Sequence, residues 1–155
     1  MADEKDNPGI RVPPPLIYLL PLLLSLLLDR RARLPFLRRN VARALGWSLL
    51  SAGALLSGWF FETMREAEAP VRTDRSVPRL TTEGPFRYTR NPGYLCLAMT
   101  YAGIAALRNS LWAILPLPLV LYAVQREVIG REERYRERAS GGEYLAYKER
   151  VRRWV

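Results

Sequence analysis

The chain contains no histidine and a single cysteine, Cys96, among its 155 residues. A lone thiol cannot form an intrachain disulfide or a cysteine-ligated metal site. The lack of imidazole also argues against zinc catalysis, histidine-ligated haem and Ser-His-Asp hydrolysis. Any chemistry must therefore depend on carboxylates, arginines, tyrosines or a bound cofactor, and we expect no metal site.

Acidic residues are also few, since 15 of them face 24 basic residues and the net charge is +9. A mean hydropathy of -0.11 conceals long apolar runs that alternate with arginine-rich segments. This alternation is typical of small polytopic membrane proteins. A nucleic-acid-binding protein would have to bury those runs, and the sequence has too little amphipathic helix to cover them. We therefore expect an all-α integral membrane protein and no nucleic-acid partner.

The apolar runs predict about four transmembrane helices within a single domain covering residues 1–155. These helices are expected at residues 16–28, 41–61, 92–107 and 111–129. The first run is short, so an interfacial or re-entrant placement is the alternative to a span. Pro116 and Pro118 predict a kink in the fourth helix.

The segments outside these helices divide into a tail at each end and a polar connection. We expect residues 1–15 to be a flexible tail, residues 62–91 a cytosolic loop, and residues 130–155 a cytosolic helical tail broken at residues 140–142. With both ends in the cytosol, that side holds 17 of the 24 basic residues, which fits the positive-inside rule. The short first loop holds six arginines and argues for the opposite orientation.

A polar, basic stretch at residues 84–94 runs directly into the third apolar helix. Pro85 and Pro92 fix the backbone on either side of a short loop that carries Arg87 and Arg90. Pro92 also suits the first position of a helix. The two guanidinium groups would then lie at the rim of a hydrophobic helix and bind an anion or a carboxylate. A basic loop that contacts lipid head groups is an equal alternative.

The C-terminal tail contains the second group of candidate residues. Glu132 and Glu133 are adjacent carboxylates, and Tyr144 and Tyr147 share one face of a helix. One alternative is a solvated helix with i,i+4 ion pairs, such as Glu149 with Arg153. Another is docking of the arginines and the terminal tryptophan on the membrane surface.

Together, the loop from Gly84 to Tyr94, the apolar hairpin after it and the tail from Glu132 to Trp154 resemble a known family. They are similar to the isoprenylcysteine carboxyl methyltransferase and phospholipid methyltransferase family, in its small bacterial form. The resemblance implies a methyltransferase of the prokaryotic cytoplasmic membrane with its active site facing the cytosol. It also implies that S-adenosylmethionine binds at the mouth of the hairpin, under the tail, and that a lipophilic small molecule or lipid is the acceptor.

The resemblance also assigns roles to residues. Arg90 and the helix start would hold the carboxylate of the cofactor, Glu132 or Glu133 its ammonium group, and the two tail tyrosines with the Gly84-Pro85 corner its adenosine. The catalytic candidates are Arg90, Asn91 and Glu133, and the cofactor-binding candidates are Gly84, Pro85, Arg90, Asn91, Tyr94, Glu132, Glu133, Tyr144 and Tyr147.

Three residues depart from the family pattern. Asn91 stands where many members have histidine, Arg136 replaces a usual leucine and Ser140 a usual phenylalanine. The last two favour the alternative function, a non-catalytic membrane scaffold or lipid-binding protein that keeps the fold. The sequence leaves open the oligomeric state and whether the methyl group goes to a carboxylate, a thiol or an amine.

Overall fold

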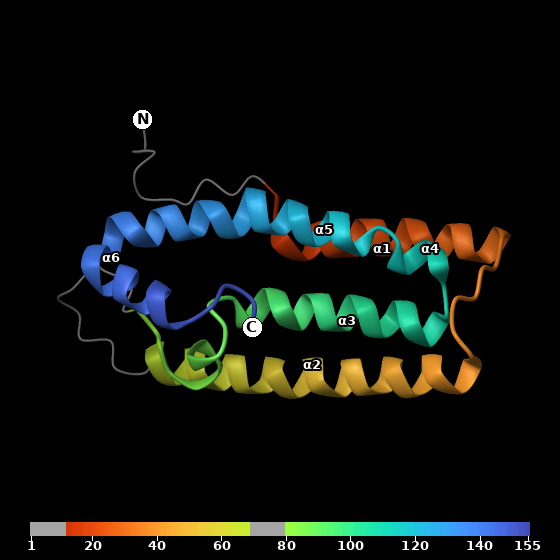
Figure 1. Cartoon of the computed structure of the whole chain (residues 1–155), viewed down its shortest axis with the longest axis horizontal. Helices are drawn as coiled ribbons and strands as arrows, with labels where there is room; N and C mark the ends of the chain where they lie inside the picture. The colour runs from red at the N-terminus through yellow and green to blue at the C-terminus, as the bar shows by residue number, and fades with distance from the viewer. Residues whose placement is uncertain (1–11, 69–79) are drawn as a thin grey trace.

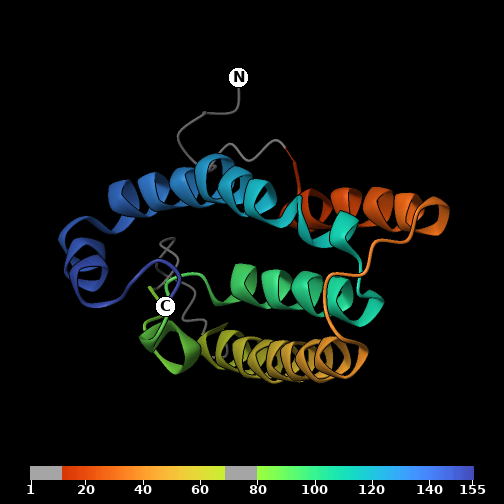
Figure 2. The same cartoon turned by 45° about the vertical axis from the view of Figure 1, so that its right-hand side comes forward.

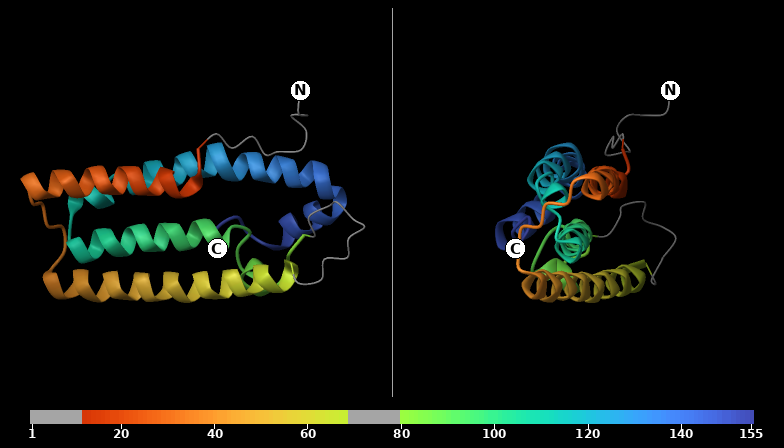
Figure 3. Two further views of the ribbon diagram at one scale, coloured as in Figure 1. Left: turned by 180° about the vertical axis from the view of Figure 1, so that it is seen from behind. Right: turned by 90° about the vertical axis from the view of Figure 1, so that its right-hand side faces the viewer.

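The structure, a computed structural model, describes residues 12–68 and 80–155, and all the regular secondary structure in these two ranges is helical. This confirms the predicted all-α class. The helices are α1 (Pro14–Arg31), α2 (Arg39–Glu68), the short 3-10 helix η1 (Gly84–Arg87), α3 (Pro92–Arg108), α4 (Leu111–Ile114), α5 (Leu117–Ala123), the π-helix η2 (Val124–Ile129) and α6 (Gly130–Arg150). Helix α3 lies between α2 on one side and α1 with the α5–α6 run on the other (Figures 1 and 3).

The antiparallel helices α2 and α3 approach each other closely at two glycines. A Cβ atom on Gly103 would lie 2.8 Å from Leu50 Cγ and 3.1 Å from the carbonyl oxygen of Gly46. Neither position leaves room for a side chain. Small residues at such points let helices pack tightly without a hydrophobic driving force, as they must in lipid.

Helix α1 buries one narrow face and leaves the rest of its surface apolar. Its buried residues Tyr18, Leu22, Ser25 and Asp29 recur at helical spacing, and the Tyr18 hydroxyl donates to the Tyr94 carbonyl at 3.2 Å. Leucines of α1 on its other faces are about half exposed. The helix therefore docks on the bundle along one polar-lined stripe and turns leucines outward.

The last third of the chain is one long helical run that is irregular at Pro116, at the π-helix η2 and at Gly141. Ser110 caps its start by accepting a hydrogen bond from the Ala113 N–H, and the α-helix is interrupted at Pro116, where the prolines predicted a kink. At Gly141 the backbone takes φ +50°, which a residue with a side chain rarely adopts, and the chain turns back toward the bundle (Figure 2). This turn lies within the break predicted at residues 140–142.

Two helical stretches are long and apolar enough to cross a membrane, judged by length and composition alone. They are residues 39–67 and 111–138. Helices α1 and α3 are shorter, at 18 and 17 residues, and α1 ends on three charged residues.

Several observed boundaries differ from the predicted ones. Helix α2 continues to Glu68, although residues from 62 onward were expected in a loop, because this charged stretch contains good helix formers and no glycine or proline. Helix α1 begins at Pro14, inside the expected tail, and α6 ends at Arg150. The expectations for residues 1–11 and 69–79 lie outside the described residues.

Candidate functional site

The loop before α3 is fixed to α2 and α6 by a small aromatic core. Gly84 has φ +57°, and a Cβ atom there would collide with the Thr63 hydroxyl of α2. Phe86 is buried against Phe60, with ring centroids 5.8 Å apart, and its carbonyl accepts a 2.7 Å hydrogen bond from the Tyr147 hydroxyl. Burial raises the pKa of Tyr147 to about 12, so this hydroxyl stays protonated and donates at neutral pH. In this structure Gly84 and Tyr147 position the loop.

Three charged side chains meet above this core. Glu133 of α6 lies 3.1 Å from Arg90 Nη1 through its Oε1 atom, and Arg153 donates to both its oxygens, at 3.1 and 2.6 Å. Arg90 and Glu133 are 7% and 5% exposed. A carboxylate buried to this degree needs paired cations, because its desolvation is otherwise costly. The three charges therefore tie the loop, the tail helix and the C-terminal segment together.

The C-terminal segment is also held by its backbone. The Arg90 N–H donates to the Arg152 carbonyl at 3.0 Å, and the Arg153 carbonyl accepts from the Asn91 side-chain amide at 3.0 Å and from the Thr89 hydroxyl at 3.2 Å. The i,i+4 pair of Arg153 with Glu149, which belonged to one alternative interpretation of the tail, does not form in the described structure. Helix α6 stops at Arg150, the backbone becomes extended at Val151, and Arg153 reaches Glu133 instead.

The Glu132 carboxylate, unlike that of Glu133, has hydrogen-bond acceptor positions that are not in use. It accepts one 2.7 Å hydrogen bond from the Tyr94 hydroxyl, and Arg136 lies 3.8 Å away. Its side chain is 21% exposed. A carboxylate has about four acceptor positions, so Glu132 can accept further donors. Of the two adjacent glutamates, the partly exposed one is the better placed to meet a ligand.

Buried polar atoms without well-formed hydrogen bonds lie near Glu133. Within the described residues these are Arg90 Nε and Nη1 and the Tyr144 hydroxyl: the Nη1 contact with Glu133 is an ion pair only, and the Tyr144 hydroxyl lies close to the Arg90 guanidinium without a hydrogen bond of good geometry. Burial, and then the negative charge of Glu133, raises the pKa of Tyr144, so its hydroxyl is protonated at neutral pH. Unsatisfied buried donors are rare and indicate a ligand or water site.

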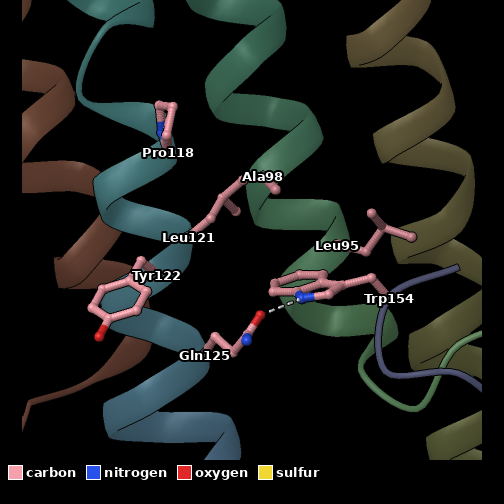
Figure 4. Close-up of a pocket in the computed structure, with 7 residues that line it drawn as sticks. All are labelled: Leu95, Ala98, Pro118, Leu121, Tyr122, Gln125 and Trp154. Carbon is pink, nitrogen blue, oxygen red and sulfur yellow. Dashed lines mark hydrogen bonds between the residues drawn. The ribbon is translucent and has the colours of Figure 1, made fainter.

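An apolar pocket of about 530 Å³ adjoins this cluster on the side of the bundle. Trp154, next to Arg153, crosses from the C-terminal segment to η2, where its indole N–H donates to Gln125 Oε1 at 3.0 Å (Figure 4). The pocket is lined by Leu95, Ala98, Pro118, Leu121, Tyr122, Gln125 and Trp154. Gln125 belongs to the π-helix, an irregularity that is frequent at functional sites.

The structure thus brings most of the sequence candidates to one end of the bundle. Those at the charged cluster are Arg90, Asn91, Tyr94, Glu132, Glu133 and Tyr144, whereas Gly84, Pro85 and Tyr147 belong to the supporting core. Sequence reasoning missed Thr89 and Gln125 as site residues, and it named Arg153 and Trp154 only in the family resemblance and in the alternative interpretations of the tail, an i,i+4 ion pair and docking on the membrane. The only signal for Arg153 and Trp154 was an arginine-tryptophan pair just beyond a helix that had been expected to include them.

A comparison with protein families gives a match that covers most of the chain. Residues 41–141 match the family model for phospholipid methyltransferases. The matched range contains Arg90, Asn91, Tyr94 and both glutamates and stops before Tyr144. Neither the curated proteins nor the solved structures give a match.

Proposed function

The chain belongs to the phospholipid methyltransferase family, and from that premise we propose that it methylates a small or lipidic hydrophobic acceptor, using S-adenosylmethionine. The single observation that supports this best is the group of buried donors without hydrogen bonds, on Arg90 and Tyr144, at the end of the bundle that also holds the partly free carboxylate of Glu132. Glu132 directly precedes Glu133, the partner of Arg90, so this end of the bundle offers both a positive and a negative partner, as a zwitterionic amino-acid group requires.

We assign the two charged ends of the cofactor to different residues. The free guanidinium atoms of Arg90 would bind its carboxylate. Glu132 would accept its ammonium group in preference to Glu133, because both oxygens of Glu133 are already in contact with guanidinium groups. The Tyr144 hydroxyl, which is a protonated donor, would bind an acceptor atom of the nucleoside part.

When bound, the cofactor supplies an electrophilic methyl group on a positively charged sulfur. The protein would align the two reactants and exclude water. Exclusion of water favours the transfer because the positive charge on the sulfur is lost during the reaction. Trp154 and the aliphatic lining of the pocket would keep water out and hold the acceptor's apolar part. A carboxylate or thiolate acceptor needs no base, whereas an amine or thiol must also lose a proton, which water or the lipid surface could accept.

This function requires the site to lie at a membrane surface, and we propose four spans with the site in the cytosol of a prokaryotic cell. At about 1.5 Å per residue, the 18 residues of α1 reach about 27 Å, close to the thickness of a bilayer core. The leucines on its outer faces suit contact with lipid. The predicted placement of 17 basic residues on the side of both termini supports the orientation.

Calorimetric titration with S-adenosylhomocysteine, the product form of the cofactor, tests the site. We expect detergent-purified wild-type protein to bind it and Glu132→Gln to bind at least about tenfold more weakly, as loss of one charge-assisted hydrogen bond predicts. Glu149→Gln is the matched control, because it makes the same change on an exposed part of α6. Equal affinity of the two variants would overturn the assignment of Glu132.

The alternative function, a non-catalytic membrane scaffold or lipid-binding protein, has one specific observation in its favour. Arg136, which stands where relatives have leucine, lies 3.8 Å from Glu132 and competes with any ammonium group there. Folded wild-type protein that binds lipid and no S-adenosylhomocysteine would establish this alternative.

A further inference from the structure

Residues 32–38 connect α1 to α2 at the opposite end of the bundle (Figure 1). Residues of this connector and of the helix ends beside it line a second pocket. Asn109 fixes this connector from the α3–α4 turn. Its Oδ1 accepts from the N–H groups of Phe36 and Leu37 at 3.2 and 3.0 Å, and its Nδ2 donates to the Leu37 carbonyl at 2.8 Å. The Trp112 indole N–H also donates to the Ala32 carbonyl at 2.8 Å. These hydrogen bonds therefore fix the conformation of the connector.

This pocket has a volume of about 470 Å³ and a strongly basic lining. Arg33, Arg39, Arg43 and Arg108 surround it, with Asp29 as its single acidic residue, which leaves an excess of three positive charges. Arg108 lies 3.5 Å from Asp29. Among residues 12–68 and 80–155, no carboxylate pairs with the other three arginines. Their guanidinium groups are free to bind an anion.

Asp29 supplies an independent sign of a ligand. The residue is 1% exposed, and within the described part of the chain its Oδ2 atom makes no hydrogen bond, its one contact being the 3.5 Å ion pair with Arg108. A buried carboxylate oxygen without a donor is costly, so a donor from a ligand would stabilise it. The arginines of the pocket can thus bind an anionic group of a ligand, and the Asp29 carboxylate can accept a hydrogen bond from a donor on the same ligand.

Apolar residues complete the lining of this pocket, namely Pro35, Ala42 and Leu107, and exposed leucines lie close to the lining in the sequence. Leu34 of the connector and Leu27 and Leu28 of α1 are 41%, 54% and 51% exposed. An amphipathic ligand would place its polar part among the arginines and its apolar part along these leucines. A phospholipid has this form.

We propose that this pocket binds a phospholipid through a head group that carries a phosphodiester and a hydrogen-bond donor. The phosphate contacts Arg33, Arg39 and Arg43, and the donor, an ammonium or hydroxyl group, reaches Asp29. Choline head groups have the phosphate but no N–H or O–H donor, so they fit less well. This lipid site is independent of the proposed methyl transfer, which belongs to the other end of the bundle.

Native mass spectrometry of the full chain in detergent, titrated with short-chain phosphatidylethanolamine, tests the proposal. We expect the double variant Arg39→Ala/Arg43→Ala to bind about thirtyfold more weakly than wild type, from the usual contribution of arginines at a lipid surface. The matched control is Arg31→Ala/Arg38→Ala, which removes the same charge at exposed positions outside the pocket. It should bind as wild type does.

Two further titrations test the chemistry of the head group. Phosphatidylcholine should bind wild type several-fold more weakly than phosphatidylethanolamine does, and Asp29→Asn should reduce that difference. Inorganic phosphate should compete only weakly, because it lacks the apolar part. Equal binding of phosphatidylethanolamine to the two double variants, equal binding of the two lipids to wild type, or competition by phosphate at the same concentration as lipid would overturn the proposal.

Discussion

Glu133→Gln would remove the one negative charge that faces two guanidinium groups at the centre of the site. The substitution keeps the size of the side chain and leaves Arg90, which is 7% exposed, without a counter-charge. Uncompensated charge of this kind typically costs about 3–5 kcal/mol. Arg153 is a third exposed and can turn to solvent, so we expect a loss near the lower end, about 3 kcal/mol.

The magnitude can be measured against a control on the same helix. Glu137 forms a 2.6 Å ion pair with Lys148, but these side chains are 31% and 37% exposed. Such pairs contribute about 1 kcal/mol or less. Glu137→Gln therefore makes the same chemical change where the surroundings are solvated.

Thermal unfolding of both variants in detergent, followed by near-ultraviolet circular dichroism, gives the comparison. For a chain of this length, a loss of 3 kcal/mol lowers the midpoint by about 6–12 °C, and the control should change it by less than about 4 °C. Added salt should reduce the difference in unfolding midpoint between wild type and the control variant Glu137→Gln. The difference in midpoint between wild type and Glu133→Gln should stay nearly unchanged, because buried charges are screened much less. Equal midpoints for the two variants would refute the view that Glu133 holds the site together.

Three further predictions concern the loop, the tail and the pocket. Gly84→Ala should destabilise the protein by about 2 kcal/mol or more, because of its positive φ and the threonine hydroxyl beneath it, whereas Gly58→Ala, with nothing near its Cβ position, should be neutral or slightly stabilising in thermal unfolding. Wild type should lose stability as the pH rises from 10.0, the ordinary tyrosine pKa, to about 12, because the unfolded chain releases the Tyr147 proton first, and denaturant titrations should show a smaller loss over that window for Tyr147→Phe. Leu121→Trp should fill the apolar pocket and lower methyl transfer at least about tenfold without changing cofactor affinity in calorimetry, and equal transfer rates for it and for the exposed control Leu119→Trp would contradict the role of the pocket.

The sequence predicted well those features that depend on local chemistry. Pro92 begins α3, Pro116 interrupts the fourth helix, and the glycines near residue 141 interrupt the tail helix, because each of these acts on its own few residues. Apolar runs located the helices, but their ends were missed where charged residues continued a helix beyond the apolar part, as in α2. The composition shows where an apolar run ends, and so where contact with lipid would end. It does not show where the hydrogen-bonded helix itself ends.

The candidate site shows the same division between local and distant effects. Arg90 and the two glutamates could be proposed from their types and the family resemblance. The contact of Arg153 with Glu133 spans 20 residues of sequence and depends on the chain turning at Gly141 and leaving the helix at Val151. The sequence predicts a break near Gly141, but it does not show in which direction the chain continues after Gly141 or after Val151. The position of the Arg153 side chain could therefore not be predicted. The structure thus assigns to Glu133 two arginine partners and to Glu132 the freer carboxylate, a distinction that adjacency in the sequence could not make.

Transfer of an isotope-labelled methyl group from S-adenosylmethionine tests the central claim most directly. Wild-type protein in lipid nanodiscs should place label in material that partitions into an organic solvent, and Glu132→Gln should place at least about tenfold less than Glu149→Gln does. Label that stays entirely in the aqueous donor, with the protein shown to be folded and the lipids including acidic, thiol and amine acceptors, would contradict the proposed methyltransferase activity.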